Sequence, residues 1–164
     1  MKKTPVVILD ASPVISLAIL KKLELLPVLF GDIFIPLAVW EEVTKSKSFP
    51  EIPQVTTFFE DRVKKTKSAN DLVSIMGYGE SEAVLLYREL KADFLIIDDR
   101  RARMIAEESG VNCIGTLAVL MKAKKKGLEP ELRSLFITLL ENKRYYKKGE
   151  LNKILSVFKE KELG

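Results

Sequence analysis

Short apolar runs alternate with longer segments of helical periodicity over the first 115 residues. The runs contain β-branched and aliphatic side chains without regular polar alternation, which is typical of strands buried on both faces of a parallel sheet. We therefore predict strands at residues 6–9, 33–35, 94–97 and 111–114. Strands that alternate with helices favour an α/β fold, in which a doubly wound parallel sheet lies between two layers of helices.

The segments between these strands carry helix signals, and so does the chain after residue 115. Ser12 predicts an N-cap and Pro13 the first helical residue, so a helix should start after the first strand. Further helices are predicted at residues 25–30, 36–45, 83–90, 100–109, 117–126, 130–142 and 150–163. Residues 45–67 are rich in Ser, Lys and Pro and read as a loop, within which residues 55–59 are either a strand or an edge segment.

Length and composition indicate a single globular domain. With 164 residues, 47% of them hydrophobic, we expect one domain over residues 1–164, with a sheet core at 1–115 and C-terminal helices at 116–164. No apolar stretch approaches the roughly 20 residues of a membrane span. Cys113 is the only cysteine, so no intrachain disulfide forms. A cytoplasmic protein without a membrane segment is the simplest expectation.

The net charge and the lack of histidine limit the ligands and catalytic groups that the chain can use. The formal net charge of +4 is compatible with contact to a phosphate backbone. Because the chain has no histidine, the usual general base and the zinc sites that need imidazole are excluded. Hydrolysis by this chain would therefore depend on carboxylates or hydroxyls.

Acidic residues directly follow two of the predicted strands. Asp10 ends the run at 6–9, and Asp98 with Asp99 ends the run at 94–97. Ligands in open α/β sheets bind beyond the carboxyl ends of the strands, so acids at these positions are candidates for a site. The alternative is that Asp98 or Asp99 is the N-cap of the next helix. One cap needs one Asp, and here there are two.

Two predicted helix starts carry further acids, Glu41 with Glu42 and Glu80 with Glu82. In a doubly wound sheet such helix starts lean over the edge that holds the strand-end acids. Carboxylates packed this closely raise one another's pKa unless a cation neutralises them. Oxygen ligands select Mg²⁺ or Mn²⁺, which support attack of water on a phosphodiester. The alternative for Glu41 and Glu42 is a solvated acidic patch favoured by the helix dipole.

The ordered set of motifs resembles the PIN-domain ribonucleases, and within them the VapC-like toxins of the DUF3368 type, over nearly the whole chain. The motifs are residues 8–13 (ILDASP), 35–43 (IPLAVWEEV), 79–83 (GESEA), 95–103 (LIIDDRRAR) and 115–117 (GTL). The resemblance implies a PIN-like fold with catalytic acids at Asp10, Glu42, Glu82 and Asp99. It implies metal ligation by Asp10, Asp99, Glu82 and Asp98, and support from Ser12, Glu80, Glu41 and Thr116. Many members have Asp at the third acidic position, where Glu82 is one methylene longer.

The resemblance also implies a function. The protein would be a Mg²⁺- or Mn²⁺-dependent endoribonuclease, acting as a toxin that pairs with a small antitoxin protein and forms a homodimer. Arg100, Arg101 and Arg103 would hold phosphates of the RNA substrate. A catalytically silent PIN-like fold that binds RNA or a protein partner is the competing interpretation.

Several of these residues keep an alternative role. The arginines of the 95–103 motif are candidates for ion pairs with Glu107 and Glu108. Ser12 either bonds a carboxylate or caps the first helix. Trp40 and the pair Tyr145 and Tyr146 are candidates for the core or for a protein interface.

Overall fold

Five parallel strands form one sheet in the computed structural model, which describes residues 3–164. They are β1 (Val6–Leu9), β2 (Asp32–Pro36), β3 (Val63–Lys64), β4 (Phe94–Ile96) and β5 (Cys113–Ile114). Their order is β3-β2-β1-β4-β5, so the chain builds outward from β1 on one side and then crosses over to β4 on the other. The predicted doubly wound parallel sheet is confirmed, and β1 and β4 flank its switch point.

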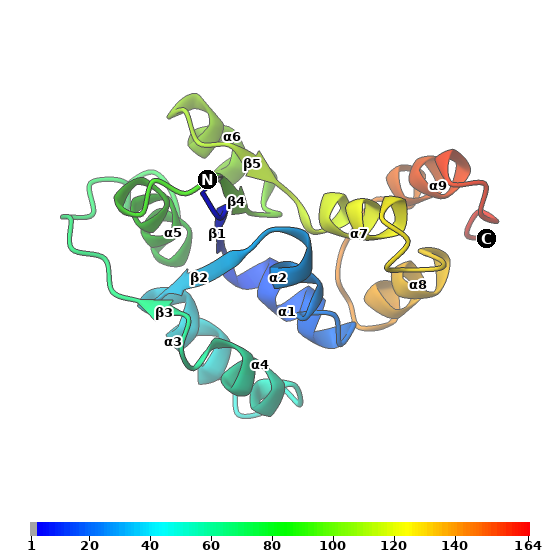
Figure 1. Ribbon diagram of the computed structural model, residues 1–164, viewed down its shortest axis with the longest axis horizontal. Helices are drawn as coiled ribbons and strands as arrows, with labels where there is room; N and C mark the ends of the chain where they lie inside the picture. Colours follow the sequence, from blue (N-terminus) through cyan, green and yellow to red (C-terminus); the bar gives the residue numbers. More distant parts are fainter. Residues whose placement is uncertain (1–2) are drawn as a thin grey trace.

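Helices cover both faces of the sheet (Figure 1). Against one face pack α5 (Tyr78–Glu89) and α6 (Arg100–Glu108). The other elements contribute to the larger buried cluster on the opposite face. They are α1 (Ala11–Ile19), α2 (Leu25–Leu29), α3 (Leu37–Lys45), α4 (Ile52–Phe59), α7 (Thr116–Lys125), α8 (Arg133–Glu141) and α9 (Lys148–Val157).

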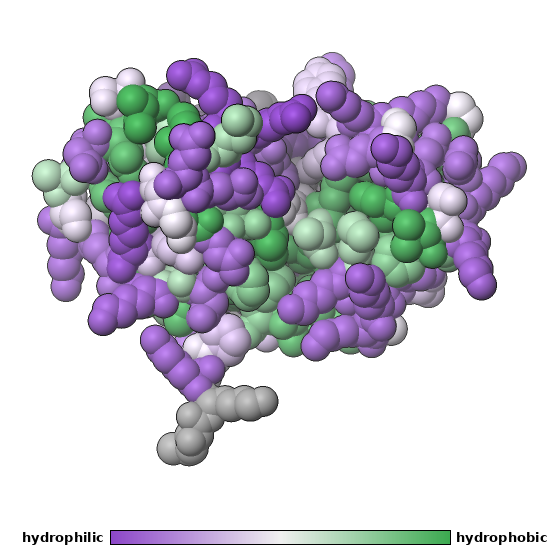
Figure 2. Space-filling model, turned by 90° about the horizontal axis from the view of Figure 1, so that it is seen from above, coloured by the Kyte–Doolittle hydropathy of each residue, from purple (hydrophilic) through white to green (hydrophobic). Residues whose placement is uncertain are grey.

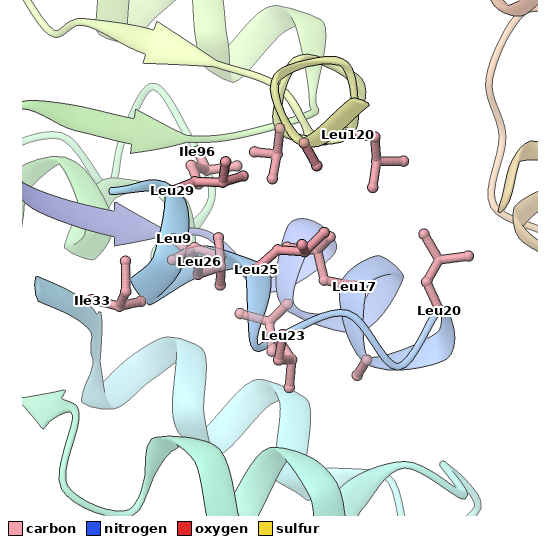
Figure 3. Close-up of a cluster of buried hydrophobic side chains, with 14 of the residues drawn as sticks. Leu9, Leu17, Leu20, Leu23, Leu25, Leu26, Leu29, Ile33, Ile96 and Leu120 are labelled. Atoms are coloured by element: carbon pink, nitrogen blue, oxygen red, sulfur yellow. The ribbon is translucent and has the colours of Figure 1, made fainter. Parts of the chain in front are cut away.

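The alternation of side chains along β1 explains why its sequence shows no polar alternation. Val7 and Leu9 belong to the larger cluster, whereas Val6 and Ile8 belong to the cluster under α5 and α6. In Figure 3, Leu9 meets the leucines of α1 and α2, with Leu120 of α7 closing the cluster from above. Both faces of β1 are therefore apolar because both are covered.

The C-terminal helices are part of the same core. Phe136 of α8 and Leu155 of α9 are fully buried in the larger cluster. Beyond α9, the Glu160 carboxylate accepts hydrogen bonds from the backbone N–H groups of Leu132 (2.8 Å) and Arg133 (2.9 Å) at the start of α8. The segment after α9 is thereby held against the start of α8.

Residues 55–59 are helical, so the prediction of a strand or an edge segment there is wrong. They lie in α4, which has Pro53 in its first turn and buries Val55, Phe58 and Phe59. Spacings of three and four residues put these side chains on one helix face. The edge strand is β3, which follows after the turn at Asp61 and has only two residues.

The start of the first helix also differs from the prediction. Asp10 occupies the N-cap position of α1, and Ser12 is the second helical residue. The helix begins directly after β1 because the Asp10 N–H already donates to the Ile96 carbonyl (3.0 Å), which leaves no connecting residue. Helices α8 and α9 are shorter than predicted, since α8 begins at Arg133 and α9 ends at Val157, whereas α5 begins earlier than predicted, at Tyr78.

Charged and polar side chains cover most of the face shown in Figure 2, with smaller apolar patches between them. Among residues 3–164, none of the helices has both the length and the apolar character that crossing a membrane requires.

Candidate active site

The ends of β1 and β4 bring two acidic residues to the same edge of the sheet. Leu9 lies beside Ile96 in the parallel register, and the Asp10 N–H donates to the Ile96 carbonyl. Asp10 follows its strand at once, and Asp98 follows β4 after one further buried residue. The predicted meeting of strand-end acids follows directly from this register.

Asp10 is the buried centre of the acidic residues, with a relative exposure of 5%. Burial raises the pKa of its carboxyl to about 7, although a hydrogen bond from the Ala11 backbone opposes this change. The negative charges of Glu80, Glu42 and Asp98 raise the pKa further. Carboxylates from four separate elements therefore act on one another here; we call Asp10, Glu42, Glu80 and Asp98 the acidic cluster.

Glu42 reaches the cluster from α3 and lies against the start of α5. A Cβ atom at Gly79 would lie 2.7 Å from Glu42 Oε2 and 3.9 Å from Asp10 Oδ1. Any side chain at position 79 would displace the Glu42 carboxylate, since real Cβ contacts are not this short. The glycine therefore leaves room for two carboxylates beside the first turn of α5.

Glu80 is the acid that α5 contributes to the cluster. Its Oε2 accepts a hydrogen bond of 3.2 Å from the Gly77 N–H. Burial raises the pKa of Glu80 and the Gly77 hydrogen bond lowers it, while the charges of Asp99 and Glu42 raise it further. Glu80, which the sequence assigned only a supporting place, thus faces the other acids.

Glu82 has different surroundings. It is buried, and its Oε2 accepts a hydrogen bond of 2.7 Å from the Thr66 hydroxyl. It also bonds the Tyr78 side chain, and this bond raises the Tyr78 pKa. Residues two apart on a helix do not share a face, so Glu80 and Glu82 point in different directions. The two acids therefore have different partners, and the assignment of Glu82 as the third acid stays a prediction.

The sequence left open whether Asp98 or Asp99 is a helix N-cap or a site residue, and the structure gives the two residues different partners. Asp99 is the N-cap of α6, because its Oδ1 accepts from the Ala102 N–H (2.8 Å). Asp98 accepts from Thr116, at 2.7 Å from the N–H and 2.6 Å from the hydroxyl. Thr116 thus holds the Asp98 carboxylate by two hydrogen bonds, and Asp99 acts on Glu80 through its charge.

Two residues near the C-terminus complete the surroundings of the strand-end acids. The Tyr146 hydroxyl donates to Asp98 Oδ2 (3.1 Å). Arg144 Nη2 donates to the Ser12 hydroxyl (2.7 Å), and its Nε donates to the Ser16 hydroxyl (3.0 Å). Ser12 is therefore neither an N-cap nor a partner of a carboxylate. Sequence reasoning missed Arg144, because its contact with Ser12 spans 132 residues and leaves no local signal.

A comparison with known families identifies the family of the chain. The DUF3368 family, described as a PIN domain, matches residues 6–160. The chain belongs to this PIN-domain family. PIN domains are generally nucleases, typically use a divalent metal and act on nucleic acid. Among curated proteins, none matches the sequence.

The arginines of this PIN domain differ in their availability. Arg103 pairs with Glu107 (Nε to Oε1, 2.9 Å), which is the alternative role that the sequence offered. Arg101 lowers the pKa of Glu80 by its positive charge and so stands near the acidic cluster. Within residues 3–164, Arg100 has no ion-pair partner. Glu41 is exposed and acts on the Tyr78 pKa, not on that of Asp10.

The acidic cluster fits a hard divalent cation by its chemistry. In the described part of the PIN domain, no three acidic or sulfur side chains already converge as ligands of one ion. The donors are carboxylate oxygens only, which suit Mg²⁺ or Mn²⁺. Burial is the main cause of the raised pKa of Asp10, and the charges of Glu80, Glu42 and Asp98 raise it further, so a bound cation would favour the charged form of this carboxyl.

Proposed function

We propose that this PIN domain is a Mg²⁺- or Mn²⁺-dependent endoribonuclease that hydrolyses RNA phosphodiesters. One observation carries the proposal: Asp10, buried at a strand end, has its pKa raised by burial and by the charges of Glu80, Glu42 and Asp98. Negative charges gathered around a buried carboxyl cost stability, and such arrangements are concentrated at functional sites.

Within this proposal, Asp10 and Asp98 are the first candidates to hold the metal, with Glu42 and Glu80 as further ligands. When bound, the metal would neutralise these carboxylates and make a water molecule acidic enough to attack the phosphodiester. The resemblance to PIN-domain ribonucleases also implies Asp99 and Glu82 as ligands, and those two assignments stay predictions. Their N-cap and Thr66 hydrogen bonds support a structural role instead.

The chain's own hydrogen bonds would orient the site. Thr116 and Tyr146 together donate three hydrogen bonds to Asp98, which restricts the rotation of its carboxylate. Arg100 and Arg101 follow directly at the start of α6, where their guanidinium groups would bind RNA phosphates. The acids would then hold the reacting centre while the arginines hold the substrate.

We further propose that the protein is the toxin of a toxin-antitoxin pair and that it forms a homodimer. The resemblance to VapC-like toxins supports both parts of this proposal. Exposed apolar side chains on and beside the C-terminal helices, at Leu128, Leu140 and Val157, offer a surface that a protein partner would cover.

The first test is cleavage of a mixed-sequence single-stranded RNA in Mg²⁺, Mn²⁺ or EDTA. Asp10→Asn and Asp98→Asn should lower the metal-dependent rate by more than about a hundredfold, because even outer partners of metal ligands contribute 10- to 100-fold. Asp32→Asn is the matched control, since Asp32 is exposed at the amino end of β2. If the wild type neither cleaves RNA nor binds Mn²⁺, the silent binding module replaces the nuclease.

A further inference from the structure

Helix α1 carries two hydroxyl groups on one of its faces. Ser12 and Ser16 are four residues apart, so their side chains lie one above the other on the helix surface. Ser16 is fully buried, and a hydroxyl group in such a place needs hydrogen-bond partners. Both hydroxyls find a partner in Arg144, in the connection between α8 and α9.

Arg144 holds α1 with a single guanidinium group. Its Nε donates to Ser16 Oγ (3.0 Å), and its Nη2 donates to Ser12 Oγ (2.7 Å) and to the Ser12 carbonyl (3.2 Å). The rigid fork of arginine donors suits several acceptors at once, whereas the ammonium group of a lysine is a compact point charge. Within residues 3–164 Arg144 forms no ion pair, so its influence on its surroundings passes through these hydrogen bonds.

The backbone of Arg144 is fixed by the end of α8. Its N–H donates to the Leu139 carbonyl (2.9 Å), and Lys143 before it has a φ of 59°, as in a Schellman turn. Helix α9 has its N-cap at Lys147, so only two residues separate Arg144 from that cap. One of these two is Tyr146, whose position therefore depends on where Arg144 is held.

A chain of hydrogen bonds leads from Arg144 to Asp98. Ser16 Oγ lies 3.5 Å from the Tyr146 hydroxyl, which donates to Asp98 Oδ2 (3.1 Å). An arginine can only donate, so Ser16 accepts from Arg144 and its own proton is free for the Tyr146 oxygen. Hydrogen bonds in such a series polarise one another, so the donor at the Arg144 end strengthens the bond to Asp98.

We propose that Arg144 is a positioning residue for the acidic cluster, because its contacts with Ser12 and Ser16 hold the Tyr146 hydroxyl against Asp98. The inference rests on the proposed nuclease function, since it concerns the orientation of one proposed metal ligand. It also gives the hydroxyl of the 8–13 motif a role: Ser12 receives a guanidinium group from the C-terminal part of the chain.

The first test needs no metal. The Thr116 N–H donates to Asp98 Oδ1 (2.7 Å), so its amide proton resonance reports the position of that carboxylate. In spectra of the isotope-labelled full chain in EDTA, Arg144→Met and Tyr146→Phe should move this resonance in the same direction. Ser16→Ala removes only the link between them and should do the same. An unmoved Thr116 resonance in Arg144→Met or in Ser16→Ala would overturn the proposal.

The second readout is Mn²⁺ affinity, titrated by electron paramagnetic resonance. Arg144→Met and Tyr146→Phe should each weaken Mn²⁺ binding about tenfold, as for other outer partners of metal ligands. The double variant should also lose only about tenfold, whereas independent effects would multiply to about a hundredfold. Arg144→Lys keeps the charge without the fork and should lose as much as Arg144→Met. Full affinity in Arg144→Lys, or multiplied losses in the double variant, would contradict positioning through Tyr146.

Arg62→Met is the matched control. Arg62 is also half-buried and donates to a backbone carbonyl, that of Phe58, but it precedes β3 at the opposite edge of the sheet from β5. This variant should change neither the Thr116 resonance nor Mn²⁺ affinity. The two readouts separate the inference from the nuclease. A moved resonance without Mn²⁺ binding rejects the metal site alone, and Mn²⁺-dependent cleavage with an unmoved resonance rejects positioning by Arg144 alone.

Discussion

The Tyr146 hydroxyl donates a hydrogen bond of 3.1 Å to Oδ2 of Asp98, a residue 48 positions earlier in the chain. Burial, followed by the charge of Asp98, raises the pKa of Tyr146 to about 12, so the phenol stays protonated and remains a donor. The connection between α8 and α9 is thereby tied to the carboxyl edge of the sheet. A C-terminal residue thus takes part in orienting a strand-end acid.

Tyr146→Phe removes this hydrogen bond and leaves the ring. We expect the metal-dependent cleavage rate to fall about tenfold, as for other outer partners of metal-binding carboxylates, while unfolding becomes easier by about 1 kcal/mol. Single-turnover cleavage and chemical denaturation measure the two effects, with Tyr145→Phe as the control. Equal cleavage rates in the two variants would show that Asp98 needs no support from Tyr146.

Asp10→Asn should stabilise the metal-free protein near neutral pH. The folded-state pKa of about 7 lies above the ordinary 3.8, so between these values the folded chain holds a proton that the unfolded chain has lost. The wild type therefore loses stability as the pH rises from about 4 to 7, by on the order of 4 kcal/mol at most. The variant should melt higher than the wild type at pH 7.5 in EDTA, and no higher at pH 4.

Added Mg²⁺ should reverse this order, because a cation that binds only the folded acidic cluster stabilises the wild type by mass action. The measurement is thermal melting of both proteins with and without Mg²⁺. Identical melting curves for the wild type in Mg²⁺ and EDTA would contradict a metal site.

Glu80→Gln and Glu82→Gln distinguish the two acids of α5. Glu80 faces the acidic cluster, so its loss should weaken Mn²⁺ binding and cleavage by 10-fold or more, on the order expected for a metal-site partner. Glu82→Gln should leave Mn²⁺ affinity nearly unchanged, since Glu82 bonds Thr66 instead. Titration of Mn²⁺ against each variant decides the matter. A larger loss of Mn²⁺ affinity in Glu82→Gln than in Glu80→Gln would favour Glu82 as the third acid, as the resemblance implies.

Gly79→Ala should damage the site without unfolding the chain. The added Cβ would lie 2.7 Å from Glu42 Oε2, so the flexible Glu42 side chain must move away from Asp10. We expect weaker Mn²⁺ binding and slower cleavage. Gly149→Ala in α9 is the control, because no atom lies within 4 Å of its added Cβ. That control should stabilise its helix by up to about 1 kcal/mol and leave cleavage unchanged.

Glu160→Gln tests the fastening of the C-terminus. Burial raises the pKa of Glu160, but hydrogen bonds from the Leu132 and Arg133 backbone and the charge of Lys124 outweigh this, so the pKa is lowered. The carboxylate therefore contributes stability above its ordinary pKa of 4.5, and this contribution is lost as the pH falls through the lowered value. The variant should lose about 1 kcal/mol at pH 7. Denaturation at pH 7 and pH 2.5 should show a difference only at the higher pH.

The sequence by itself predicted four of the five strands, all but the two-residue edge strand β3, and the position of acids at the carboxyl edge of the sheet. Apolar runs ending in Asp10 and in Asp98 with Asp99 indicate buried parallel strands, and the carboxyl ends of neighbouring parallel strands lie together whatever the loops do. The helical C-terminal segment followed from periodicity in the same way. The strands, the acids that follow them and the C-terminal helices all depend on local sequence patterns, which can be recognised in a single sequence.

Only the tertiary structure decided which acids face one another. The choice between Glu80 and Glu82 depends on how α5 is rotated against β1, and packing of the whole core sets that rotation. The contacts of Arg144 and Tyr146 depend on where α8 and α9 return to the sheet. Such contacts join residues far apart in the chain, and the fold that brings them together is the sum of all its packing interactions.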